Sequence, residues 1–166
     1  LAGFEGYKKY YDADARLFLV RDWRGMERYY ARLLAYQKAF GVSDVIFTGH
    51  IPFDEILAYY RLADVFVCAS EHEGFCVPLV EAMYFNIPII AYDSSAIGDT
   101  LGGSGILMPE KTPALTAGMI HRVLSDAELK ETILAGQQKR LQDFSHQKIR
   151  ARFRACLEQF MMKGRA

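Results

Sequence analysis

The chain has 166 residues, 51% of them hydrophobic and 13% aromatic, which is enough to bury the core of one ordinary domain. Its 20 Lys and Arg residues balance its 20 Asp and Glu residues. This balance argues against nucleic acid as a partner, because nucleic-acid-binding proteins carry an excess of positive charge. Three cysteines, Cys68, Cys76 and Cys156, lack metal-ligand spacing, which favours a reducing, cytoplasmic compartment over a disulfide scaffold.

Short apolar runs alternate with segments of helical periodicity along most of the chain. The pattern predicts helices over 1–11, 26–40, 53–62 and 78–85, and strands over 17–20, 45–48, 64–68, 87–92 and 105–108. Gly41 ends the second helix, and Pro52 and Pro78 stand at the starts of the next two. Such alternation is typical of an α/β fold: one Rossmann-like three-layer domain whose mainly parallel sheet binds ligands at the carboxyl ends of its strands.

The strands stop after Thr112, and three C-terminal helices are expected to follow. In the first of them, apolar residues share one helical face: Leu115, Met119, Ile120, Val123 and Leu124. The other two helices are expected over 126–142 and 147–162. In the last one, basic and apolar side chains alternate, which favours a solvated face but leaves open a peripheral contact with an anionic membrane or with another domain. No stretch approaches the roughly 20 apolar residues needed to span a bilayer.

The segment between the predicted strand 64–68 and the helix 78–85 combines three features of an anion site. Gly74 allows a ligand to approach the backbone, and the start of the next helix presents amide donors near Cys76 and Val77. Two carboxylates, Glu73 and Glu81, flank these donors. Carboxylates beside a phosphate need neutral hydrogen-bond donors such as sugar hydroxyls, because like charges repel at close range. The alternative is that these glutamates are solvated surface charges.

These residues resemble the signature of the carboxyl-terminal domain of family 4 (group 1) glycosyltransferases, which have the two-domain GT-B architecture. That signature opens with Glu-Gly-Phe-Gly, places seven residues between two glutamates, and continues with Ala-Met. It stands here as Glu73-Gly74-Phe75 through Glu81-Ala82-Met83. The resemblance extends to 45–52, 63–67, 92–99 and 105–109.

The resemblance implies retaining transfer of a hexose from a nucleoside diphosphate sugar to an acceptor in glycan or glycolipid synthesis, with no cofactor and no metal. Glu73 would be the catalytic candidate, acting through the donor hexose and not by covalent attack. The amides of Gly74, Phe75, Cys76 and Val77 would bind hydroxyls and diphosphate, and Glu81 would bind the ribose. His50 and Ile51 would line the pocket of the base, although a turn between strand and helix also needs such residues for local reasons.

The chain departs from the family pattern in two ways. Cys76 replaces the second glycine, and a buried, inert thiol is the favoured interpretation. The family's first strand, with its Arg and Lys for the diphosphate, and the N-terminal acceptor domain are expected to be missing, so the isolated domain 1–166 is expected to be inactive. We therefore expect either that 17–20 pairs directly with 64–68, or that residues outside this sequence fill the gap.

The sequence supports other classes of function less well. A non-catalytic nucleotide-binding or regulatory domain that kept the fold is the main alternative, supported by Cys76 and by the missing basic strand. A dinucleotide oxidoreductase is disfavoured, because no Gly-x-Gly-x-x-Gly follows a strand.

Overall fold

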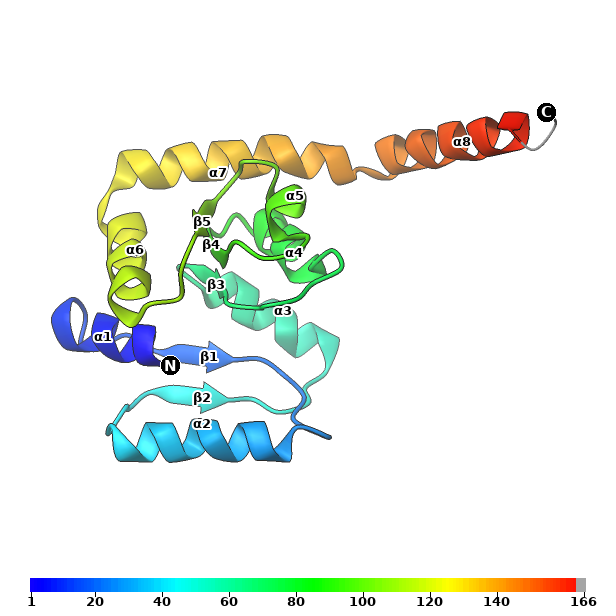
Figure 1. The fold of residues 1–166 in the computed structure, drawn as a ribbon. Helices are drawn as coiled ribbons and strands as arrows, with labels where there is room; N and C mark the ends of the chain where they lie inside the picture. The colour runs from blue at the N-terminus through cyan, green and yellow to red at the C-terminus, as the bar shows by residue number, and fades with distance from the viewer. Residues whose placement is uncertain (164–166) are drawn as a thin grey trace.

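A computed structural model describes residues 1–163 (Figure 1). The last three residues of the predicted range 1–166 therefore lie outside the described residues. Elements follow in the order α1 (Ala2–Tyr10), β1 (Leu17–Leu19), α2 (Glu27–Ala39), β2 (Val45–Phe47), α3 (Phe53–Leu62), β3 (Phe66–Cys68), α4 (Val77–Tyr84), β4 (Ile89–Tyr92), α5 (Ile97–Leu101), β5 (Ile106–Met108), α6 (Pro113–Ser125), α7 (Ala127–Leu141), η1 (Gln142–Phe144) and α8 (His146–Lys163).

All the described strand pairs are parallel, as the sequence predicts, but they form two sheets. One sheet has the order β1-β2 and the other has the order β3-β4-β5. The prediction that 17–20 pairs directly with 64–68 is wrong, because β1 pairs with β2 and β3 pairs with β4. Alternating strands and helices show that the chain crosses over through α3 between β2 and β3. They do not show which strand lies beside β3 in the sheet. The other alternative, a strand from outside this sequence, stays a prediction.

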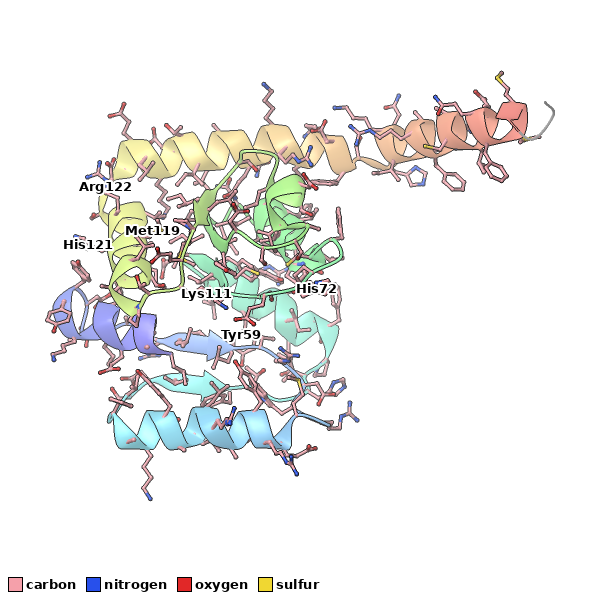
Figure 2. All side chains as sticks on the ribbon, in the orientation of Figure 1. Tyr59, His72, Lys111, Met119, His121 and Arg122 are labelled. Carbon is pink, nitrogen blue, oxygen red and sulfur yellow. The ribbon has the colours of Figure 1, made fainter. Side chains whose placement is uncertain are left out.

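Side chains rather than backbone hydrogen bonds connect the first sheet to the elements beside it. Tyr59 of α3, labelled in Figure 2, packs its ring against that of Phe18 on β1, with the ring centroids 5.2 Å apart. The Trp23 ring lies against Tyr30 of α2 and Phe47 of β2, with ring centroids 5.1 and 5.7 Å apart. An aromatic layer therefore covers this short sheet.

The central strand β4 separates two apolar clusters, because successive side chains of a strand point to opposite faces. Ile89 and Ala91 belong to the cluster that contains Leu79 and Met83 of α4. Ile90 belongs to the cluster that contains residues of α1 and α6. Helices thus cover both faces of the second sheet, which confirms the expected three-layer arrangement.

A buried glutamine connects α7 to the start of β4. Gln137 is 0% exposed, its Oε1 accepts a hydrogen bond from the N–H of Ile89 at 3.0 Å, and its Nε2 donates to the carbonyl of Ile87 at 2.7 Å. The side chain therefore satisfies two backbone groups that would otherwise be buried without partners. This contact fixes α7 to the strand that leads into the site described below.

Helix α8 projects away from the rest of the chain in Figure 1. Its large apolar side chains are exposed: Ile149, Phe153, Leu157, Phe160, Met161 and Met162. The three interpretations of this helix stay predictions: a solvated face, a membrane contact or a contact with another domain. Among residues 1–163, no helix combines the length and the apolar character needed to cross a membrane.

Candidate functional site

Two segments that follow neighbouring strands meet at the carboxyl end of the second sheet. The loop 69–75, which we name the motif loop, follows β3, and the segment 93–96 follows β4. Hydroxyl groups hold the motif loop at three points: Ser94 Oγ donates to the carbonyl of Ser70 at 2.7 Å, the N–H of Glu73 donates to Ser95 Oγ at 2.8 Å, and Thr100 Oγ1 donates to the carbonyl of Phe75 at 2.5 Å. The loop is therefore positioned by the next strand and by α5.

The predicted glycine of the motif loop faces open space. A Cβ placed on Gly74 would meet no heavy atom within 4 Å, and the residue does not need a positive φ. No packing within the described chain therefore demands glycine at this position. The open space beside its backbone is the property expected where a ligand approaches closely.

Cys76 caps the start of α4 in a left-handed conformation, with φ 63° and ψ 69°. Glycine adopts this conformation without strain, which explains why the family pattern has glycine here. The Cys76 side chain is only 6% exposed, so the prediction of a buried thiol is confirmed. Because the side chain points into the core, it does not cover the amides at the start of α4, where Pro78 stands in the first turn.

Glu81 of α4 is held by a tyrosine from the preceding helix. Tyr60 Oη donates a hydrogen bond to Glu81 Oε2 at 2.8 Å, and the Tyr60 ring stacks on Phe85 with centroids 5.3 Å apart. Burial first, and then this hydrogen bond, raise the pKa of Tyr60 above its ordinary value of 10.0. The phenol therefore stays protonated and fixes the orientation of the carboxylate.

A lysine from a third segment reaches the motif loop. Lys111, labelled in Figure 2, follows β5; its Nζ forms an ion pair with Glu71 Oε1 at 2.5 Å. The same ammonium lies 4.6 Å from the centroid of the Tyr92 ring. Lys111 lowers the pKa of Glu71 through this hydrogen bond. The Glu71 carboxylate is therefore paired with a side chain of the same chain.

The residues predicted to line the base pocket come from the other sheet. His50 and Ile51 follow β2, and the His50 side chain is 71% exposed with its Nδ1 3.6 Å from Asp22 Oδ2. In Figure 1 the connection from β2 to α3 and the motif loop lie on the same side of the molecule. Their part in a common site remains a prediction. Within the described range 1–163, no three His, Cys, Asp or Glu side chains are grouped as metal ligands.

Sequence reasoning missed the residues that hold the site in place. Ser94 and Ser95 lie in 92–99, a segment included in the family resemblance, but no role was predicted for them or for Thr100. Tyr60 lies on a helix whose aromatic residues are equally typical of a core. The one usable signal was the pair of hydroxyl residues directly after a buried strand, where ligand-side loops begin.

Comparison with known proteins gives consistent matches. The family model "Glycosyl transferases group 1" matches residues 12–140. The D-inositol 3-phosphate glycosyltransferase of Streptomyces bingchenggensis is 34% identical over 114 residues, which cover 67% of this chain and 25% of the relative. The chain thus spans about a quarter of the length of that relative.

Solved structures agree with this match. The C-terminal domain of the group 1 glycosyl transferase LpcC from Francisella tularensis has a TM-score of 0.70 at 26% identity, covering 85% of this chain and 74% of that chain. The Anabaena protein HepE in complex with UDP and glucose has a TM-score of 0.75 at 23% identity, covering 87% of this chain and 40% of that chain. With most of its length matched by the family model, the chain belongs to the group 1 glycosyltransferases, and its fold is that of a GT-B carboxyl-terminal domain.

Proposed function

We propose that this chain binds the donor in a retaining transfer of a hexose from a nucleoside diphosphate sugar to an acceptor. The observation that carries the proposal is the motif loop, which is anchored to the neighbouring strand end by Ser94 and Ser95 and leads directly into α4. Membership of the family and the UDP and glucose bound by the HepE structure support a nucleotide-sugar donor. The acceptor-binding domain would be a separate part of the enzyme.

The two motif glutamates divide the recognition of the donor between them. Glu73 contacts the hexose hydroxyls, because it lies in the loop and is fixed through its backbone N–H. Glu81 accepts a hydrogen bond from the ribose, and Tyr60 holds its carboxylate in the required orientation. The base lies against His50 and Ile51.

Backbone amides contribute the electrostatics of the reaction. When the glycosidic bond to the diphosphate breaks, negative charge grows on the phosphate oxygens and an oxocarbenium-like centre forms on the sugar. The amides of Gly74, Phe75, Cys76 and Val77 and the positive end of α4 stabilise that charge from fixed positions. This arrangement needs no metal ion and no covalent attack by Glu73.

The competing proposal is a regulatory domain that binds nucleotide without turnover. Its support from Cys76 is weakened by the structure, because the thiol is buried and leaves the amide side of the loop open. We therefore favour the catalytic role. A protein that binds nucleotide sugars tightly and neither transfers nor hydrolyses the sugar would instead support the regulatory role.

The test compares Glu73→Ala and Glu81→Ala in the full-length protein that carries this sequence. Calorimetry against UDP, GDP and ADP and their hexose conjugates first identifies the donor. Glu81→Ala should weaken the nucleotide and its sugar conjugate equally, whereas Glu73→Ala should weaken only the conjugate, each by about 10- to 100-fold. Glu71→Ala is the matched control, because Glu71 lies in the same loop as Glu73 but its carboxylate pairs with Lys111. Equal losses of both ligands in both variants would refute the division of roles.

A further inference from the structure

Two cysteines lie at the two ends of the motif loop. Cys68 is the last residue of β3, Cys76 caps α4, and their Sγ atoms are 3.9 Å apart. Both side chains are buried, at 7% and 6% exposure, whereas Cys156 is exposed on α8. The two buried sulfurs therefore touch each other across the base of the loop that carries Glu73.

Little movement separates this contact from a covalent bond. A disulfide has its sulfurs about 2.05 Å apart, so the two Sγ atoms must approach by about 2 Å. Cys68 is fixed in the sheet through its pairing with Ala91. Cys76 belongs to an irregular turn, with φ 63°, next to the exposed Phe75. The shift therefore falls on Cys76 and on the start of α4.

The contact also differentiates the two thiols. The contact with the Cys76 thiol lowers the pKa of Cys68 below the ordinary value of a thiol, and hydrogen bonds from Ser70 act in the same direction. The same contact and burial raise the pKa of Cys76. The directions of these shifts favour Cys68 as the attacking thiolate and Cys76 as the protonated partner that resolves an oxidised intermediate.

We propose that Cys68 and Cys76 form a peroxide-sensitive dithiol that closes to an intrachain disulfide. The Cys68 thiolate attacks one oxygen of hydrogen peroxide, the O–O bond breaks, and with one proton the products are a sulfenic acid and water. The Cys76 sulfur then attacks the sulfenic sulfur, and its proton leaves with the hydroxyl as a second water. Two thiols are oxidised and one peroxide is reduced. A small oxidant suits a buried thiolate, and a thiol reductant reverses the bond.

Closure of this disulfide changes donor binding, a consequence that rests on the proposed function. The Cys76 amide is one of the proposed diphosphate donors, and movement of Cys76 towards Cys68 withdraws it from the ligand. We expect oxidation to weaken nucleotide-sugar binding by about tenfold, the effect of one lost hydrogen bond to a charged group.

The covalent step is tested in the full-length protein by titration with hydrogen peroxide followed by peptide mass spectrometry. We expect a cross-linked peptide that joins residues 68 and 76, lacks two hydrogens and is cleaved by dithiothreitol. In Cys76→Ser, dimedone should label Cys68 as a trapped sulfenic acid, and Cys76→Gly, which suits the left-handed backbone, should behave in the same way. The proposal is overturned if Cys156 becomes oxidised while Cys68 and Cys76 remain thiols.

The functional consequence has a separate readout. Donor affinity is measured by calorimetry for the reduced and the peroxide-treated protein, with Cys156→Ser as the background and Cys76→Gly as the insensitive control. Unchanged affinity after complete formation of the disulfide overturns the effect on the donor. If the reduced protein binds no nucleotide sugar, the proposed function fails, and the mass-spectrometric result still decides whether the dithiol exists.

Discussion

Replacement of Gln137 by methionine tests how α7 supports the strand that leads into the site. Methionine keeps the unbranched shape and similar volume but removes both hydrogen-bonding groups. The N–H of Ile89 and the carbonyl of Ile87 then lose partners at 3.0 and 2.7 Å, at a position where the side chain is 0% exposed. A buried backbone group without a partner costs about 1–3 kcal/mol. Two such groups give a loss of about 2–6 kcal/mol, a large part of the 5–15 kcal/mol typical of a domain.

Urea unfolding of the chain, followed by far-ultraviolet circular dichroism, measures this loss. The adjacent Gln138 supplies a matched control, because its Nε2 donates to the carbonyl of Met83 at 2.9 Å but the residue is exposed. Water replaces that bond, so Gln138→Met should cost about 1 kcal/mol or less. If the two methionine variants unfold at the same urea concentration, the reasoning from Gln137 is refuted.

Three further variants test α3, the contact between α1 and α6, and α6 itself. Tyr60→Phe should cost about 1–2 kcal/mol in urea unfolding, because it removes the hydrogen bond to Glu81 and keeps the ring. Since the pKa of Tyr60 is raised above 10.0 in the folded state, the unfolded chain loses this proton first, and the wild type should lose stability above pH 10 more steeply than Tyr60→Phe. Gly3→Ala should cost about 1–3 kcal/mol, because its Cβ would lie 2.6 Å from Thr116 Cγ2. Gly118→Ala, with open space at the Cβ position, should instead stabilise α6 by about 0.5–1 kcal/mol.

The sequence predicted the elements best where local chemistry marks both ends. The helix 53–62 has the bounds that were expected after Pro52, because proline sets its start. Strand β3 begins at Phe66 and not at Asp64, because its pairing with β4 begins at Phe66. Helix α5 was missed because five residues are too few to show a helical period. The split into two sheets depends on the distance between strands, which periodicity does not encode.

The candidate site was predictable to the extent that its groups are contiguous. Residues 73–81 bring two carboxylates and a helix start together within one short segment, so their spacing can be read directly. The support from Ser95 and Tyr60 comes from other elements. Neither has a local pattern that distinguishes it from a surface hydroxyl or a core aromatic residue. Tertiary contacts therefore decide which glutamate is fixed by its side chain and which by its backbone.

Three glutamates close to a proposed phosphate site would repel the ligand unless each has a defined partner. Glu71 forms an ion pair with Lys111, and Glu81 accepts a hydrogen bond from Tyr60. Segment 93–96 holds Glu73 through its backbone: the N–H donates to Ser95 Oγ and the carbonyl accepts from the N–H of Ala96. Its carboxylate is therefore the one suited to move with the sugar. Because Lys111 already pairs with Glu71, the proposed anion binding by this loop depends on amide N–H groups and the start of α4 more than on side-chain charge. Raising the salt concentration from low to physiological should therefore change nucleotide affinity much less than in a site built on lysine or arginine side chains.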